Sequence, residues 1–292
     1  MAVEERDPQS GYLTTGHEWN GIKELNAPVP KVVWAFLIVT HVWAFAYIVL
    51  MPAIPLGITY TKGLLGADDR KAVTRAVEDA ARERRPWTRL IDNGSWQSIQ
   101  TNPALMQNVR QTGRTLFADN CAVCHGADAQ GGKGYPSLVT SSWLWGGDAD
   151  SISETIRVGI NSTHPKTRVG QMLAFGRDGI LPRTDIEAIT DYVLSLSGRT
   201  PASTTQERLE TGKLAFIAQC ISCHGPEGKG KVDLGAPDLS DQHWIYGGDA
   251  QSIHTSIWGG RQGQMPSWEE RLSALDRKIL TLYLLDLRPK TP

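Results

Sequence analysis

All four cysteines of this 292-residue chain belong to two copies of one pattern, C-x-x-C-H, at residues 121–125 and 220–224. This pattern is typical of c-type haem attachment, because two thiols at that spacing reach the two vinyl groups of one porphyrin while the adjacent histidine reaches its iron. No cysteine remains for a structural disulfide. The sequence therefore predicts two covalently bound haem c groups, attached at Cys121, Cys124, Cys220 and Cys223, with His125 and His224 as axial iron ligands.

Paired cysteines also serve in redox dithiols and in zinc sites. A dithiol of the thioredoxin type would accompany a βαβ pattern, which the sequence lacks. A zinc site could combine two C-x-x-C pairs. Here, however, the pairs begin 99 residues apart, at Cys121 and Cys220, and each lies inside its own copy of a repeat. Haem attachment explains both pairs better than either alternative.

A 20-residue stretch without a charged residue, residues 32–51, indicates a membrane helix. At 1.5 Å rise per residue it would span about 30 Å, the thickness of the hydrocarbon layer. A cleavable signal peptide would place a shorter apolar core close to the N-terminus, whereas here 31 mostly polar residues come first. We expect a retained transmembrane anchor at residues 32–52, preceded by an N-terminal segment of residues 1–31.

Basic residues flank this stretch on both sides and do not decide its orientation. Haem is attached to c-type cytochromes outside the bacterial inner membrane, so we expect the haem-binding part in the periplasm and the N-terminus in the cytoplasm. His41 lies in the middle of the span, where an ionisable residue is a functional candidate. A neutral histidine bonded to a partner helix and an axial haem ligand are both open interpretations.

The two haem patterns lie in two copies of a longer repeat. In each copy a glycine precedes the first cysteine by eight residues, and an aromatic-Gly-Gly-Asp tetrapeptide follows, at 145–148 and 246–249. Each copy ends in an apolar helical pattern, at 186–196 and 274–287. We expect this last helix to cross the first helix of its own copy at a glycine and an aromatic residue, and so to close each domain.

The sequence thus predicts a mainly α-helical protein with one N-terminal transmembrane helix and two tandem class I cytochrome c domains. The first domain would comprise residues 106–199 and the second residues 207–292, with a linker at 200–206. The connector at residues 53–105 contains an Ala-rich, charged helical pattern. Its basic side chains would be solvated, or would contact lipid phosphate or a partner subunit.

Each iron needs a second axial ligand or an open position. Only Met172 and Met265 follow a haem pattern, one in each copy, and each completes a Gly-Gln-Met sequence in a loop. Methionine in a protein core would more often belong to an apolar helical stripe. We expect His/Met ligation at both irons, which raises the potential and favours electron transfer over oxygen binding. Which haem each methionine reaches stays open, and the alternative ligands are His164, His243 and His254.

A ligating histidine usually donates its other N–H to a carbonyl oxygen, which fixes the tautomer. The loops that contain Pro136 and Pro237 follow the haem patterns closely enough to supply these carbonyls. Trp145 and Tyr246, the aromatic residues of the two tetrapeptides, could donate to haem propionates or simply pack in the core.

Two N-terminal stretches carry a resemblance to a known family. Residues 16–26, GHEWNGIKELN, with Pro28-Val-Pro30, and then Pro52-Ala-Ile-Pro55 with residues 60–66, YTKGLLG, are similar to the CcoP/FixP family. This family is the di-haem subunit of cbb3-type cytochrome c oxidase, and the resemblance covers essentially the whole chain. Some members have two N-terminal membrane helices, whereas this sequence has one.

The resemblance implies an electron-transfer subunit of a proton-translocating haem–copper oxidase in the bacterial inner membrane. The chain would accept electrons from a donor cytochrome c and pass them to a mono-haem cytochrome c subunit and then to the haem–copper catalytic subunit. Oxygen reduction and proton pumping would belong to that catalytic subunit. The resemblance also implies axial roles for Met172 and Met265.

Two other functions fit the haem patterns. One is a free-standing, membrane-anchored di-haem carrier that serves another reductase. The repeat and the anchor fit it equally well, and only the N-terminal family stretches argue against it. The other is a di-haem peroxidase, which needs one iron with an open or displaceable axial position. A nucleic-acid partner is not expected, because the formal net charge is only −1.

Overall fold

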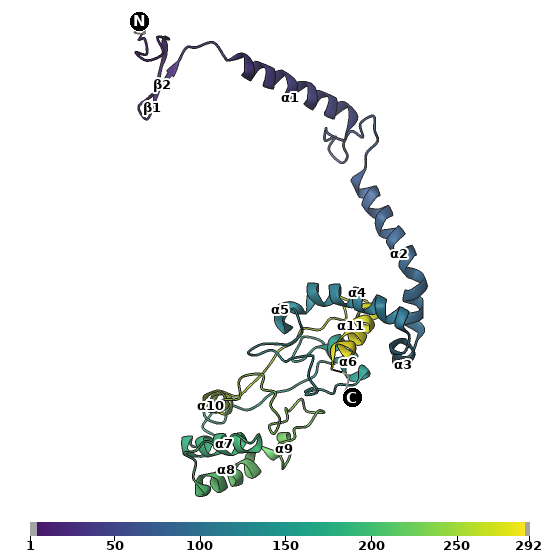
Figure 1. Ribbon diagram of the computed structural model, residues 1–292, viewed down its shortest axis with the longest axis vertical. Helices are drawn as coiled ribbons and strands as arrows, with labels where there is room; N and C mark the ends of the chain where they lie inside the picture. The colour runs from purple at the N-terminus through teal and green to yellow at the C-terminus, as the bar shows by residue number, and fades with distance from the viewer. Residues whose placement is uncertain (1–4, 290–292) are drawn as a thin grey trace. The chain divides into compact units, whose positions relative to one another are not determined.

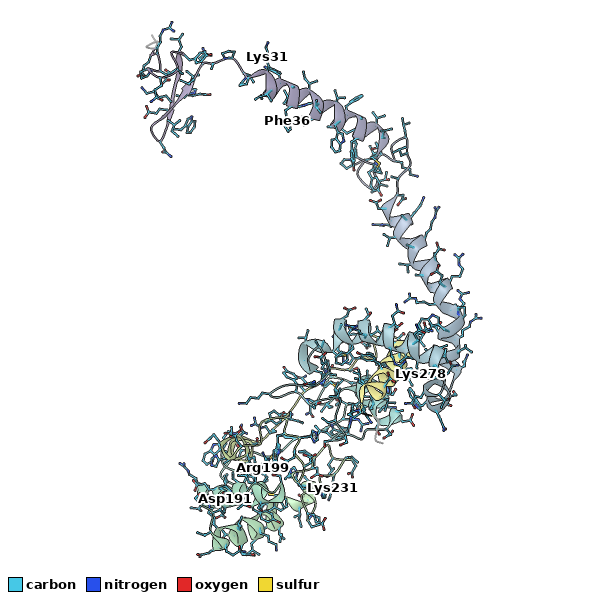
Figure 2. The ribbon with its side chains drawn as sticks, viewed as in Figure 1. Lys31, Phe36, Asp191, Arg199, Lys231 and Lys278 are labelled. Atoms are coloured by element: carbon cyan, nitrogen blue, oxygen red, sulfur yellow. The ribbon has the colours of Figure 1, made fainter. Side chains whose placement is uncertain are left out.

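The apolar stretch near the N-terminus is one uninterrupted helix, α1 (Lys31–Leu50; Figure 1). The computed structural model describes residues 5–289. The chain divides into two compact units between Glu83 and Arg84, and α1 belongs to the first. Apolar side chains such as Phe36 project outward all along the helix (Figure 2), and none is buried within the chain. By length and composition α1 can cross a membrane, and these uncovered side chains suit contact with lipid.

A β-hairpin precedes α1, a feature that was not predicted from the sequence. Strands β1 (Thr14–Trp19) and β2 (Ile22–Leu25) pair antiparallel, with Trp19 opposite Ile22. Asn20 and Gly21 join them, with φ of 50° and 85°. An Asn-Gly pair between two strands is a strong hairpin signal, because the tightest turns need positive φ at both central residues.

The charged helical pattern of the connector forms helix α2 (Asp69–Asn93), as predicted. Nearly all of its side chains are exposed, and its C-terminal part belongs to the second unit. Ile91, near the end of α2, is fully buried in a hydrophobic core of that unit, together with Ile99. The C-terminal end of α2 and the residues that follow it therefore belong to the hydrophobic core of the second unit.

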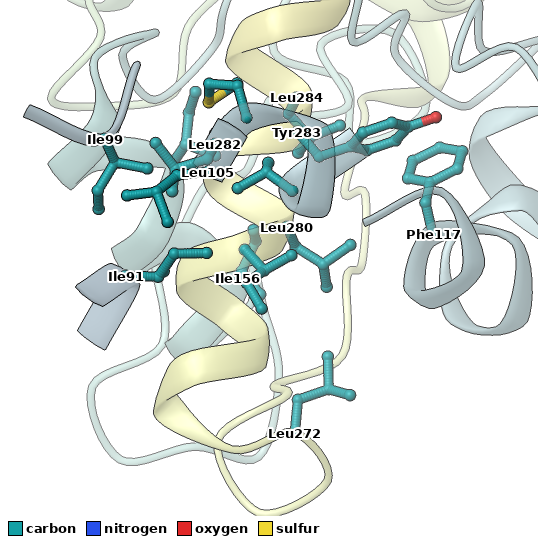
Figure 3. Packing of buried hydrophobic residues seen from close by; sticks show 14 of the residues in the cluster. Ile91, Ile99, Leu105, Phe117, Ile156, Leu272, Leu280, Leu282, Tyr283 and Leu284 are labelled. Carbon is teal, nitrogen blue, oxygen red and sulfur yellow. The ribbon is translucent and has the colours of Figure 1, made fainter. Parts of the chain in front are cut away.

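The first hydrophobic core of the second unit, core A, surrounds helix α4 (Pro103–Asn120). Asn102 caps α4 by accepting hydrogen bonds from two backbone N–H groups of its first turn. Phe117 is 2% exposed and packs near Tyr283 (Figure 3). The other helices of core A are α3 (Trp96–Gln100), α5 (Ala122–His125), α6 (Ala149–Val158) and α11 (Ala274–Leu287).

The second hydrophobic core, core B, surrounds helix α8 (Gln206–Gln219). Phe216 is 1% exposed and packs near Tyr192. The buried carboxylate of Asp191 accepts hydrogen bonds from Arg208 at 2.6 Å and from Thr204 at 3.1 Å, which fastens α8 and the linker to the preceding helix. The other helices of core B are α7 (Arg183–Leu196), α9 (Ile221–His224) and α10 (Ala250–Gly259).

The two copies of the repeat exchange their closing helices. Helix α7 ends the first copy but packs on α8 of the second, and α11 ends the second copy but packs on α4 and α6 of the first. Figure 1 shows α11 beside α4, although the two helices lie far apart in the sequence. The expected crossing of a glycine and an aromatic residue is present, because Gly113 faces Tyr283 and Gly212 faces Tyr192. The expectation that each crossing lies within one copy is wrong.

Contacts between arginine side chains and aromatic rings show the same exchange between the two copies. Arg199 follows α7, and its guanidinium lies 5.0 Å from the ring of Trp244 in the second copy. Arg288 follows α11, and its guanidinium lies 4.2 Å from the ring of Trp143 in the first copy. Lys278 of α11 donates to the backbone oxygens of Asp92 and Gly94 (Figure 2). Each core is therefore assembled from both copies.

Candidate functional site: two haem-attachment turns with exchanged methionine loops

Each C-x-x-C-H pattern forms one tight turn at the end of a core helix. In the first, the carbonyl oxygen of Cys121 accepts hydrogen bonds from the N–H groups of Cys124 and His125 at 3.2 and 3.0 Å. In the second, the carbonyl oxygen of Cys220 accepts the same pair of bonds at 3.2 and 2.9 Å. The turn brings two thiols and one imidazole together, as attachment of a single porphyrin requires.

Both histidines make the carbonyl contact that the sequence analysis expected. His125 Nδ1 lies 3.0 Å from the Pro136 carbonyl oxygen, and His224 Nδ1 lies 3.1 Å from that of Pro237. A carbonyl oxygen can only accept, so each Nδ1 donates and each Nε2 keeps the lone pair that an iron ligand needs. Burial lowers the pKa of both imidazoles, against a smaller opposing effect of these hydrogen bonds, and favours the neutral, ligating form.

The cysteine environment differs from that of a redox dithiol. Burial raises the pKa of the Cys121 thiol to about 11 and that of the Cys220 thiol to about 11. A catalytic dithiol needs the opposite shift, because the thiolate is the nucleophile. The second cysteine of each pair, Cys124 or Cys223, is exposed. These thiols suit permanent thioether attachment rather than reversible disulfide exchange.

The methionine loops are exchanged between the two motifs. Met265, from the second copy, packs in core A, the core that also contains Cys121 and Leu138. Met172, from the first copy, packs in core B with Cys220 and Leu239. Each methionine therefore lies beside the haem-attachment turn of the other copy.

Backbone hydrogen bonds hold this exchange in place. Ile160 and Met265 form a reciprocal pair of N–H···O bonds, both 2.9 Å long. Met172 and Arg261 form the equivalent pair, at 2.8 and 3.1 Å. A Cβ at Gly159 would collide with the carbonyl oxygen of Met265, and a Cβ at Gly260 would press on that of Met172. Glycine is required at both positions because the opposite methionine loop passes so close.

Both attachment turns open into one continuous cavity of about 630 Å³. Its wall is mainly apolar, which suits a porphyrin, and the thiols and imidazoles of both motifs lie along it. The residues that could bind a haem group all line it: Cys121, Cys124, His125, Met172, Cys220, Cys223, His224 and Met265. The donor set of thiol pairs, neutral imidazoles and thioethers fits haem c.

Trp145 and Tyr246 line the same cavity, and each has an arginine against its ring. The Arg168 guanidinium lies 5.3 Å from the Trp145 ring, and that of Arg261 lies 4.2 Å from the Tyr246 ring. Arg168 Nε is buried and has no hydrogen-bond partner among residues 5–289. Sequence reasoning missed both arginines, although the repeated pattern Arg-x-Gly-Gln-Met, at 168–172 and 261–265, marks them.

The alternative histidine ligands make other contacts. His164 Nε2 lies 2.6 Å from a carboxylate oxygen of Glu269, and the His254 ring stacks on Trp258 at 6.1 Å. His243 lines the cavity, but its Nδ1 faces the Ser142 hydroxyl at 3.3 Å. The methionines remain the better candidates, since they alone recur at matching places in the two cores. In α1, His41 Nδ1 bonds the Leu37 carbonyl of its own helix.

Comparison with protein families matches three consecutive parts of the chain. Residues 11–57 match the N-terminal domain of cytochrome oxidase-cbb3, FixP. Residues 111–197 match cytochrome c, and residues 207–284 match cytochrome c oxidase, cbb3-type, subunit III. The cytochrome c domains imply covalently bound haem c, in agreement with the chemistry of the two attachment turns.

Curated relatives match over nearly the full length. A cbb3-type cytochrome c oxidase subunit FixP from Azorhizobium caulinodans is 44% identical over 95% of this chain and 94% of its own. The FixP subunit from Bradyrhizobium diazoefficiens is 41% identical over 97% of both chains. The CcoP subunit from Azospirillum brasilense is 42% identical over 98% of this chain and 99% of its own. The chain therefore belongs to the FixP/CcoP family, the subunit III family of cbb3-type cytochrome c oxidases.

Proposed function

We propose that this chain is the electron-entry subunit of a cbb3-type cytochrome c oxidase and relays electrons through two covalent haem c groups. The observation that carries the proposal is the pair of haem-attachment turns on one continuous cavity. The relatives that match this chain over more than nine-tenths of their own length are cbb3 oxidase subunits. Each haem iron supplies one-electron redox chemistry. We do not expect this chain to bind oxygen, because a methionine is available as the second axial ligand of each iron.

The axial ligand pairs of this proposal are crossed. His125 of the first copy would hold its iron together with Met265 of the second, and His224 of the second together with Met172 of the first. The packing of Met265 in core A and of Met172 in core B supports these pairs. Filling both axial positions with histidine and methionine raises the potential and disfavours peroxide or oxygen binding.

The side chains near the cavity wall would bind the haem propionates. Trp145 with Arg168, and Tyr246 with Arg261, combine an aromatic ring and a guanidinium at equivalent places of the two copies. The unpartnered, buried Nε of Arg168 would gain a carboxylate acceptor there. This assignment extends the sequence-based suggestion for Trp145 and Tyr246 to their arginine partners.

In the membrane, α1 would act as a single-pass anchor with the N-terminus in the cytoplasm and both haem-binding cores in the periplasm. Electrons would come from a donor cytochrome c and leave to the mono-haem cytochrome c subunit. From there they would reach the haem–copper catalytic subunit, which reduces oxygen and moves protons. The partners are inferred from the oxidase assignment of the relatives.

Purification from native membranes tests this proposal. A C-terminally tagged chain, extracted with mild detergent, should bring a haem–copper subunit and a mono-haem cytochrome with it and should show oxygen uptake with reduced cytochrome c. Haem staining after denaturing electrophoresis should locate covalent haem on this chain, and its haem-to-protein ratio should be two. Full oxidase activity left behind in membranes stripped of this chain would contradict the proposal and would favour a free-standing carrier.

A further inference from the structure

The two copies of the repeat differ by an insertion next to the methionine loops. In the second copy, Arg261 follows directly after Gly260, whereas in the first copy eight residues, 160–167, separate Gly159 from Arg168. The insertion folds back on its own start, because Arg168 N–H donates to Gly159 O at 3.1 Å and Asn161 N–H donates to Arg168 O at 2.8 Å. It therefore forms a small, closed loop beside core A.

Asn161 lies at the start of this loop with φ of 46°, a left-handed conformation that asparagine tolerates better than most residues. Its side-chain amide makes three hydrogen bonds. Nδ2 donates to Gly170 O at 2.8 Å and to Gly263 O at 2.7 Å, and Oδ1 accepts from Gly170 N at 3.2 Å. Each donor and acceptor is thus matched, and no other orientation of the amide would satisfy all three partners.

The two glycines that bond Asn161 occupy the same sequence position relative to the two proposed methionine ligands. Gly170 precedes Met172 by two residues, and Gly263 precedes Met265 by two residues. Asn161 also follows Ile160, whose backbone pairs with that of Met265. One side chain therefore bonds both methionine loops, although these loops serve different cores and come from different copies of the repeat.

We propose that Asn161 is a positioning residue that couples the two distal methionine loops, so that both methionine–iron bonds depend on its one side chain. The inference rests on the proposed crossed ligation. Because Asn161 bonds the two loops at once, loss of its amide removes hydrogen bonds from both of them. The two haems are then linked through ligand positioning as well as through their charges.

Asn161→Gly, compared with Ser162→Ala, tests this inference in the full-length, haem-loaded chain in detergent. Glycine tolerates the left-handed backbone and removes the side chain with its amide. Ser162→Ala is the matched control, because the Ser162 hydroxyl bonds only within the insertion and its own helix end. Two readouts report the ligation: the strongly shifted proton resonances of each iron-bound methionine methyl group, and the affinity of the oxidised chain for added imidazole, which must displace methionine.

For Asn161→Gly, both sets of methionine resonances should shift, and imidazole should bind more tightly at both haems. The Met265 loop loses one neutral hydrogen bond and should show about a fivefold effect, whereas the Met172 loop loses two and should show roughly a thirtyfold effect. Ser162→Ala should leave both haems unchanged. If Asn161→Gly fails to load haem, Asn161→Asp carries the same test, since the carboxylate cannot donate to either glycine carbonyl.

An effect of Asn161→Gly and Asn161→Asp at only one haem, or at neither, would overturn the inference. An effect of Ser162→Ala equal to that of Asn161→Gly would also overturn it, because the insertion as a whole, not the amide, would then matter. Failure of the proposed ligation has a different signature: the unmodified chain would lack one or both sets of methionine resonances.

Discussion

At the scale of single residues, the exchange of Met172 and Met265 leads to a prediction. It is the opposite of what two independent copies of the repeat would give. Met172→Ala should remove methionine from the haem attached at Cys220, although that haem lies in the other copy. The packing reason is that Met172 shares core B with Cys220 and Leu239. The potential of the affected haem should fall, because methionine ligation raises it.

Paramagnetic NMR identifies which haem is affected. In Met172→Ala, the haem that keeps its methionine should show proton contacts to Leu138, which lies in core A with Met265. Met265→Ala is the mirror control, and its surviving methionine-ligated haem should contact Leu239 in core B. The opposite assignment would show that each methionine serves its own copy.

A second residue-scale prediction concerns acid stability. Hydrogen bonds, first from Arg157 and then from His164, hold the pKa of Glu269 at about 2, against an ordinary value of 4.5. Arg157 lies 2.8 Å and His164 lies 2.6 Å from the Glu269 carboxylate, so the contact joins the two copies of the repeat. A carboxylate with a depressed pKa stabilises the fold above its unfolded pKa, and this contribution is lost as the pH falls through the folded pKa.

The part of the stability that depends on Glu269 should therefore disappear between about pH 4.5 and pH 2. Thermal unfolding of Glu269→Gln across this range should start from a lower midpoint at neutral pH and should converge with the unmodified chain near pH 2. Asp178→Asn is the control, because Asp178 pairs only with its neighbour Arg177 on the surface. A midpoint difference that is constant from pH 7 to pH 2 would contradict the assignment.

At the scale of helices, the crossings at Gly113 and Gly212 are close contacts between the two copies. A Cβ at Gly113 would lie 2.6 Å from Cβ of Tyr283, and a Cβ at Gly212 would meet the Ala188 backbone. Overpacking of this kind costs typically 1–3 kcal/mol, which exceeds the gain of roughly 1 kcal/mol from replacing glycine by alanine in a helix. Both Gly→Ala variants should lower the unfolding midpoint.

The matched control is Gly259→Ala in α10, where a Cβ would meet nothing within 4 Å. This variant should leave the midpoint unchanged or raise it, for the same helix-propensity reason. Thermal unfolding of the three variants, followed by far-ultraviolet circular dichroism, provides the measurement. If Gly113→Ala were as stable as Gly259→Ala, α4 and α11 would not cross as described.

The same crossings explain which parts of the fold could be predicted from the sequence. The haem-attachment turns, the anchor, the charged connector helix and the glycine–aromatic crossings all follow from local patterns. The choice of partner does not, because Gly113 with Phe117 and Gly212 with Phe216 present equivalent helix faces, and Tyr192 and Tyr283 fit either one. A repeat makes its helices interchangeable to any argument from periodicity, so the exchange emerged only in three dimensions.

In the candidate site, the sequence identified the residues that are expected to bind haem, but it missed residues that contact the loops of these proposed ligands. Pro136 and Pro237 could be predicted, because a short loop after the histidine has little choice of position. Arg168 and Asn161 could not, because their roles depend on loops that meet only through the exchange. The missed Asn-Gly hairpin at residues 20–21 is different, since its turn signal is local and was available.

At the scale of the whole molecule, the two copies of the repeat in the haem-binding part are interleaved and do not form two independent domains. Core A needs α11 from the second copy, and core B needs α7 from the first. The linker, near residues 200–206, joins the closing helix of the first copy to the opening helix of the second. It belongs to neither core. Unfolding of one core should therefore expose the other, and the two should melt together.

Cleavage in the linker distinguishes the two architectures. Ala202 and Ser203 are exposed, so a specific protease site inserted between them should be cut in the folded, haem-loaded chain. Because each half then supplies a closing helix and a methionine loop to the other, the cut chain should still migrate as one species in size-exclusion chromatography under native conditions. It should also keep both methionine-ligated haem signals, and denaturing electrophoresis should show two haem-stained fragments. Independent tandem domains would instead separate after the cut, each with its own intact haem site.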